Sequence, residues 1–120
     1  MFKKIAVSIL LSISIIGATL PVMAGATYGK YKSAQVVRVG YTDEHKVTFD
    51  AGKIATVVVV GDGSSDIDCQ IVDINGNLIA QDVSFRDGCA LSWIPFYTIP
   101  FFIRVINAGD SADLYALVTN

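Results

Sequence analysis

The residues with the clearest potential to bind an ion are six aspartates between Asp62 and Asp87, a stretch that contains a single arginine. Asp62, Asp66 and Asp68 lie where a Gly-Ser-rich loop enters a predicted strand. Calcium takes roughly six to eight oxygen ligands, which three carboxylates, loop carbonyls and water could supply. The alternative is a solvated acidic edge whose aspartates form turn hydrogen bonds and discourage edge pairing. We favour the solvated edge, because the spacing is not the D-x-[DN]-x-[DN]-G pattern of a calcium loop.

Catalysis has few candidate residues, since His45 is the only histidine. It follows Asp43 and Glu44 and precedes Lys46, a charged string that is typical of a solvated turn. A Ser-His-Asp relay would need a serine and a carboxylate beside the imidazole, and no G-x-S-x-G motif supports one. Asp66 and Asp68 are two residues apart and project from the same face of one predicted strand. Carboxylates in this arrangement do not lie on either side of a scissile bond, as the two acids of a glycosidase do. The sequence therefore predicts a protein that is not an enzyme.

Cys69 and Cys89 are the only two cysteines. Strand alternation predicts that both side chains point inward, and an exported protein meets an oxidising environment that favours a disulfide. Such a bridge would stabilise the fold by about 3 kcal/mol. The alternative is two buried thiols that pack as small hydrophobic groups. A redox role is not expected, because there is no C-x-x-C spacing and no neighbouring cation to lower a thiol pKa.

Large apolar side chains are concentrated between Trp93 and Phe102. Strand alternation leaves some of them outside, and Phe96, Tyr97 and Ile99 form the candidate recognition surface for a partner or a sugar ring. The alternative is an aromatic corner that packs beneath its own loop.

The segment 1–24 predicts the compartment in which the chain acts. Lys3 and Lys4 precede an apolar stretch, and Ala24 ends a sequence that signal peptidase could read. The alternative is an uncleaved membrane anchor, but about 20 apolar residues are usual for a span, and glycine, threonine and proline interrupt this stretch early. We expect a cleaved signal peptide and an exported product, periplasmic or secreted, with no stable membrane span after processing.

The 96 residues that follow Ala24 (120 minus 24) suit one domain. The formal charge of the whole chain is -2, and removal of Lys3 and Lys4 leaves -4 on the rest. Because there is no basic stripe, no nucleic-acid partner is expected. Strand-forming Val, Ile, Thr, Tyr and Phe are abundant, and Glu44 is the only glutamate. We expect a loose N-terminal arm over 25–34 and a single β-sandwich domain over 35–120.

Short apolar runs alternate with Gly, Asp, Asn and Ser at the spacing of an all-β sandwich. The predicted strands lie near 35–41, 45–50, 54–60, 67–74, 78–82, 89–94, 101–107 and 112–119. The run Val57–Val60 is apolar at every position, which predicts a central strand covered on both faces. Asn75-Gly76-Asn77 predicts a hairpin turn, since Asn-Gly supplies the positive φ angles of a tight turn.

Alternation also predicts which side chains form the core. The inward candidates are Ile67, Cys69, Ile71, Cys89, Leu91, Trp93, Phe101, Ile103, Val105, Leu114, Ala116 and Val118.

Several segments between Gly52 and Asn120 resemble the bacterial pre-peptidase C-terminal domain and its small secreted relatives. They are GDGSSDIDCQIVDINGNLIAQD, CALSWIP, PFFIRVINAG and YALVTN. The resemblance implies a jelly-roll-like β-sandwich with a role in binding or targeting rather than chemistry. Two positions depart from the family pattern: Cys69 stands where an aliphatic residue is usual, and Tyr97-Thr98-Ile99 stands where an aromatic-Thr-Gly corner is expected.

These observations predict an all-β, jelly-roll-like sandwich of about eight antiparallel strands. We expect a non-catalytic binding or interaction module whose partner is an unknown protein or glycan in the envelope or outside the cell. The alternative is a stand-alone inhibitor or a structural envelope protein, and a hydrolase is the least favoured class. No cofactor is expected apart from the calcium considered above.

Overall fold

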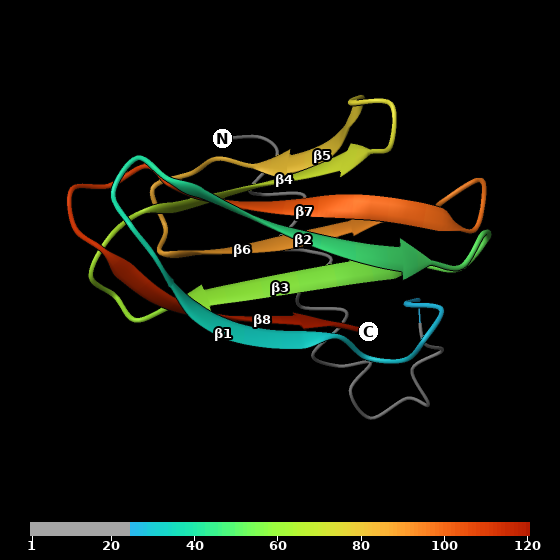
Figure 1. The fold of residues 1–120 in the computed structure, drawn as a ribbon, viewed down its shortest axis with the longest axis horizontal. Helices are drawn as coiled ribbons and strands as arrows, with labels where there is room; N and C mark the ends of the chain where they lie inside the picture. The colour runs from blue at the N-terminus through green and yellow to red at the C-terminus, as the bar shows by residue number, and fades with distance from the viewer. Residues whose placement is uncertain (1–24) are drawn as a thin grey trace.

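The structure, a computed structural model, describes residues 25–120 as two four-stranded β-sheets that pack face to face (Figure 1). The predicted signal peptide, 1–24, lies outside the described residues. The strands are β1 (Lys32–Val37), β2 (Thr42–Phe49), β3 (Ala55–Gly61), β4 (Ile67–Asp73), β5 (Leu78–Asp82), β6 (Gly88–Trp93), β7 (Ile99–Asn107) and β8 (Asp113–Thr119). One sheet has the order β1-β8-β3-β6 and the other β2-β7-β4-β5, with all paired strands antiparallel. The predicted eight-stranded, jelly-roll-like sandwich is confirmed.

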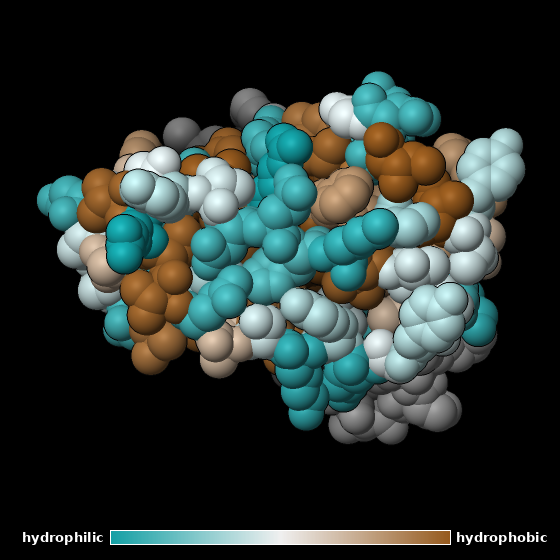
Figure 2. All heavy atoms as spheres, in the orientation of Figure 1, coloured by the Kyte–Doolittle hydropathy of each residue, from teal (hydrophilic) through white to brown (hydrophobic). Residues whose placement is uncertain are grey.

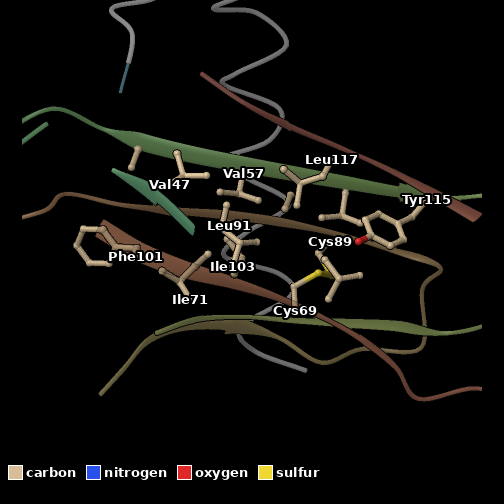
Figure 3. Close-up of a cluster of buried hydrophobic side chains, with 14 of the residues drawn as sticks. Val47, Val57, Cys69, Ile71, Cys89, Leu91, Phe101, Ile103, Tyr115 and Leu117 are labelled. Carbon is tan, nitrogen blue, oxygen red and sulfur yellow. A yellow bond between two sulfur atoms is a disulfide. The ribbon is translucent and has the colours of Figure 1, made fainter. Parts of the chain in front are cut away.

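The core lies between the two sheets and is built by strand alternation (Figure 3). On β7, Phe101, Ile103 and Val105 are buried, and the residues between them are partly exposed. The predicted inward faces of β4 and β7 are confirmed. On β6, Cys89 and Leu91 are buried as predicted, and Trp93 packs against the core while partly exposed.

The valine run belongs to β3, which lies between β8 and β6. Val57 and Val59 are buried, whereas Val60 is exposed. The prediction of a central strand is confirmed, but the prediction that both of its faces are covered is wrong. A sandwich has two layers, so the outer face of each sheet meets solvent.

The last strand, β8, turns the opposite face inward from the one predicted. Its buried residues are Asp113, Tyr115, Leu117 and Thr119. Leu114 and Val118, predicted to lie in the core, are 51% and 38% exposed, and Ala116 is exposed as well. Two polar residues occupy inward positions because each finds a hydrogen-bond donor: Asp113 accepts the N–H of Asp62, and the hydroxyl of Thr119 accepts the N–H of Tyr31.

The segment before the first predicted strand is held in place, in contrast to the loose arm expected over 25–34. β1 begins at Lys32 rather than at Gln35. Ala26 is buried and bridges to Phe49 of β2, and its N–H donates to the carbonyl of Asn120 at 3.2 Å. The backbone groups of this segment are therefore paired with strands that are distant in sequence.

The turn between β4 and β5 confirms the predicted hairpin. The N–H of Gly76 donates to the carbonyl of Asp73 at 3.1 Å, and Gly76 has a φ of +84°. The Asp73 carboxylate accepts the N–H groups of Asn75 and Asn77, each at 2.9 Å. Among residues 25–120, only glycines have a positive φ, so the prediction of a positive φ at Asn75 is wrong. The connection has four residues, 74–77, and a loop of this length needs only one left-handed position.

Cys69 and Cys89 form the predicted disulfide, with 6.1 Å between their Cα atoms (Figure 3). Cys69 is on β4 and Cys89 on β6, which belong to opposite sheets. The bond therefore crosses the core and joins the two layers of the sandwich.

Candidate functional site

Three connections meet at one end of the sandwich and bring together a group of carboxylates that are far apart in sequence. Asp62 follows β3, Asp87 precedes β6 and Asp113 is the first residue of β8. Each contributes one oxygen to a group in which all lie within 4.8 Å of one another. We call these three residues the acidic cluster.

Asp113 is the buried member of the acidic cluster. Its side chain is fully excluded from solvent, and Oδ1 accepts the backbone N–H of Asp62 at 3.2 Å. Oδ2 is buried and receives no hydrogen bond from an N–H or hydroxyl group within residues 25–120, while the carboxyl group as a whole lies within hydrogen-bonding reach of Asp87 and Asp62. Burial, together with the adjoining Asp87 carboxyl group, raises the pKa of Asp113 to about 7.

Asp87 lies against β3, where a glycine makes room for it. A Cβ atom on Gly61 would overlap Oδ1 of Asp87, so no larger residue fits at position 61 while the carboxylate keeps this position. Oδ2 of Asp87 accepts the N–H of Gly63 at 2.5 Å. Oδ1 is buried without a hydrogen-bond partner in the described part of the chain.

Asp62 is the exposed member and is oriented by backbone donors. Oδ1 accepts the N–H of Ser64 at 3.0 Å, and Oδ2 accepts the N–H of Leu114 at 3.4 Å. Hydrogen bonding by Ser64 lowers the pKa of Asp62, with a smaller contribution from Leu114. Asp62 therefore stays ionised under conditions in which Asp113 takes up a proton.

Only one of the three predicted calcium ligands, Asp62, belongs to the acidic cluster. Asp68 lies on β4 in the other sheet, and Asp66 directly precedes that strand. The structure places Asp87 and Asp113 beside Asp62 instead. The aspartate-rich stretch in the sequence indicated Asp87, but the wrong face assigned to β8 hid Asp113.

The loops around the acidic cluster are fixed by Asn107, a buried residue at the end of β7. Its Nδ2 donates to the carbonyls of Val37 at 3.0 Å and Ser111 at 2.7 Å. Its Oδ1 accepts the hydroxyl of Ser65 at 2.8 Å and the N–H of Gly109 at 3.0 Å. Two donors and two acceptor positions are the full capacity of an asparagine side chain. One residue thus holds the connections β1–β2, β3–β4 and β7–β8 in register.

His45 lies in the core on β2, so the prediction of a solvated turn is wrong. Its Nδ1 is 2.9 Å from the hydroxyl of Tyr31, and its Nε2 is 2.7 Å from the hydroxyl of Tyr115. The Tyr115 hydroxyl donates to Oδ2 of Asp43 at 2.8 Å. Because the proton of the Tyr115 hydroxyl is used in that bond, the hydroxyl oxygen accepts a hydrogen bond from Nε2–H of His45. Nδ1 of His45 then accepts from the Tyr31 hydroxyl, so the ring is the neutral tautomer with its proton on Nε2.

This His–Tyr network is suited to joining the sheets rather than to catalysis. Burial lowers the pKa of His45, with Asp43 opposing the change, and burial raises the pKa of Tyr115. Both rings thus resist a change of charge near neutral pH. Within the described residues, no serine is among the hydrogen-bond partners of His45.

The opposite end of the sandwich carries the predicted recognition residues. Phe96 and Tyr97, in the loop between β6 and β7, are 90% and 72% exposed. Ile99, the third predicted residue, is the first residue of β7 and packs against the core. On the face in Figure 2, hydrophilic side chains cross the middle, and hydrophobic side chains lie toward both ends.

The loop that carries Phe96 and Tyr97 is anchored on both sides. The N–H of Gly52 donates to the carbonyl of Pro95, and the N–H of Ala51 donates to the hydroxyl of Thr98, each at 2.9 Å. These bonds connect it to the turn between β2 and β3. The aromatic rings are therefore presented by a loop with fixed ends.

Neither a protein-family model nor a curated protein matches the sequence. Several solved structures share the fold. One is PliG of Aeromonas hydrophila, a periplasmic lysozyme inhibitor of g-type lysozyme, with a TM-score of 0.57 and 13% identity over 76% of this chain and 84% of that one. Another is the pre-peptidase C-terminal domain of collagenase from Bacillus anthracis, with a TM-score of 0.61 and 11% identity over 76% of this chain and 89% of that domain. The Yersinia pseudotuberculosis-derived mitogen has a TM-score of 0.55 and 9% identity over 77% of this chain and 85% of the mitogen chain.

These similarities establish the β-sandwich fold. A periplasmic inhibitor and a pre-peptidase C-terminal domain both use it. Residues 25–120 hold no helix with the length and hydrophobicity that a bilayer span requires.

Proposed function

We propose that the chain is an exported, non-catalytic binding module that contacts a protein partner through the loop 94–98. The observation that carries the proposal is the exposure of Phe96 and Tyr97 on a loop with anchored ends. Aromatic side chains supply much of the energy at protein interfaces, and a pre-ordered loop loses little entropy when it binds. The disulfide between the sheets suits a protein that acts outside the cytoplasm.

The test is a capture experiment with purified residues 25–120 and an envelope extract. The double variant Phe96→Ala/Tyr97→Ala should retain the fold, since both side chains lie in solvent, and should lose the captured partner by about tenfold or more. Phe85→Ala is the matched control: Phe85 is 93% exposed and precedes β6, at the opposite end of the sandwich. Capture that survives the double variant, or that Phe85→Ala abolishes, would contradict the proposal. Competition by a soluble oligosaccharide would identify a glycan partner instead.

A second candidate function, inhibition of an envelope hydrolase, is supported by the fold shared with the lysozyme inhibitor of Aeromonas hydrophila. The assay is turnover of g-type lysozyme in the presence of an equimolar amount of the purified chain. Inhibition that the Phe96→Ala/Tyr97→Ala variant abolishes would support this function. Unchanged turnover would remove g-type lysozyme as the target.

A further inference from the structure

We propose that the acidic cluster binds one divalent cation of the size of calcium through the carboxylates of Asp62, Asp87 and Asp113. The site lies at the opposite end of the sandwich from the loop 94–98, so it does not depend on the proposed function.

Two buried oxygens point to a ligand. Oδ2 of Asp113, on a side chain that is fully excluded from solvent, and Oδ1 of Asp87 receive no hydrogen bond from an N–H or hydroxyl group among the described residues, and the two carboxyl groups lie within hydrogen-bonding reach of each other. A buried carboxylate oxygen without a donor is costly, and more so when a second carboxylate lies close by. A cation between them would compensate both charges.

The surrounding hydrogen bonds leave these oxygens free to coordinate. Backbone N–H groups donate to the other oxygens of Asp87 and Asp113 and to both oxygens of Asp62, which also has a side-chain hydrogen bond with Ser64. A carboxylate oxygen with one hydrogen bond retains further lone-pair positions, so Asp62 is still able to act as a ligand. Gly61 leaves room for the carboxylate of Asp87, and Asn107 fixes the loops next to Asp62 and Asp113.

The ion class follows from the donor set and its spacing. Carboxylates alone, without histidine or cysteine, suit hard cations such as calcium and magnesium rather than soft metals. Oxygens bound to one calcium ion, at about 2.3 to 2.6 Å, lie at most about 5 Å apart, whereas magnesium, at about 2.1 Å, requires at most about 4.2 Å. All three oxygens of the acidic cluster lie within 4.8 Å of one another, inside the limit for one calcium ion, and the calcium and magnesium titrations below decide between the two hard cations.

The experiment is a calcium titration of chelator-treated residues 25–120 at about pH 8, where the ligands are deprotonated. Isothermal calorimetry should give one saturable site, and the melting temperature should rise with calcium. Binding should be weaker by about tenfold or more in Asp113→Asn and in Asp62→Asn. Asp62 is exposed, so the second variant keeps the test valid if the first does not fold.

Asp110→Asn is the matched control, because Asp110 is exposed, lies in the loop before β8 and undergoes the same change of charge. It should bind calcium as the wild type does. The absence of binding in the folded wild type up to about 10 mM calcium, above the range of weak extracellular modules, would overturn the site and leave a proton shared by Asp87 and Asp113 as the explanation. The proposed site would also be contradicted if Asp110→Asn weakened calcium binding as much as Asp62→Asn does, or if the wild type bound magnesium more tightly than calcium.

Discussion

His45 on β2 and Tyr115 on β8 belong to opposite sheets, and their side chains meet in the core with 2.7 Å between Nε2 and the hydroxyl oxygen. The hydroxyl of Tyr115 also accepts from Nε2 of Gln35 at 2.8 Å and donates to Asp43. The network therefore connects β1, β2 and β8 by polar contacts at a place where the sheets otherwise meet through apolar side chains. Such a network specifies how the two layers align, since a shifted layer would leave buried polar atoms unpaired.

The first prediction concerns pH. Because burial lowers the pKa of His45, the unfolded chain binds a proton more readily than the folded chain between the folded pKa and 6.5. The free energy of unfolding should therefore fall as pH is lowered below 6.5, by up to about 1.4 kcal/mol per pH unit from this group. His45→Gln should remove this contribution, as measured by urea unfolding between about pH 5 and 7 in chelator.

The comparison with His45→Gln is needed because Asp113 acts in the opposite direction. Its pKa is raised to about 7, so the folded state holds the proton more tightly, and this contribution to stability is lost as pH rises through that value. The difference between the wild type and His45→Gln, measured in an Asp113→Asn background, isolates the histidine. Parallel pH profiles of the two proteins would show that His45 does not titrate with a lowered pKa.

The second prediction concerns the disulfide. Replacing Cys69 and Cys89 with alanine should lower the free energy of unfolding by about 3 kcal/mol, because the bond closes a loop with a sequence separation of 20 residues. Reductant should shift the urea midpoint of the wild type in the same direction and leave the double variant unchanged. Thiol labelling of unreduced mature protein, or a wild-type midpoint that reductant does not move, would contradict the bond.

The third prediction concerns Asn107. Asn107→Ala should cost about 2 to 4 kcal/mol of unfolding free energy, since it removes four hydrogen bonds from a buried site and leaves their partners unpaired. Asn107→Asp should also destabilise, because a carboxylate cannot donate to the carbonyls of Val37 and Ser111. Exposed Asn77→Ala is the control, with an expected effect within about 1 kcal/mol. Similar urea midpoints for the two alanine variants would exclude the proposed role of Asn107.

The fourth prediction concerns the hairpin turn. Gly76→Val should destabilise by about 1 to 2 kcal/mol, because a φ of +84° is unfavourable for a β-branched residue. A Cβ at this position meets nothing within 4 Å, so the effect isolates backbone strain from steric overlap. Gly76→Asn should cost less, since asparagine tolerates the left-handed region. Equal melting temperatures of the valine and asparagine variants would argue against strain as the cause.

The strand positions and the β4–β5 hairpin follow well from the sequence, because both signals are local. Alternating apolar residues such as Ile67 and Ile71 indicate the strands and their inward faces, and the segment 74–77 indicates the connection of β4 to β5. The disulfide follows from the same alternation, which places Cys69 and Cys89 inward. Neither argument requires knowledge of which strands pair.

The functional residues are harder to predict, because their burial depends on partners distant in the chain. Asp113 and Thr119 are inward only because the N–H groups of Asp62 and Tyr31 reach them, and no local pattern indicates either contact. Without those donors, alternation assigns Leu114 to the core, which hides the acidic cluster. His45 is hidden for the same reason: its neighbours in sequence are charged, and its partners in space are tyrosines.

The bond between Cys69 and Cys89 also determines how far the molecule extends under load. If the two ends of residues 25–120 were pulled apart, the chain between the cysteines would stay folded back on itself, since force passes through the sulfur atoms and bypasses it. At about 3.3 to 3.6 Å per residue, the 20-residue separation corresponds to about 66 to 72 Å of contour length, and the bond, which spans 6.1 Å between the Cα atoms, withholds about 60 to 66 Å of it until it is reduced. A narrow pore or a pulling protease would thus have to accept a doubled chain over this part of the oxidised protein.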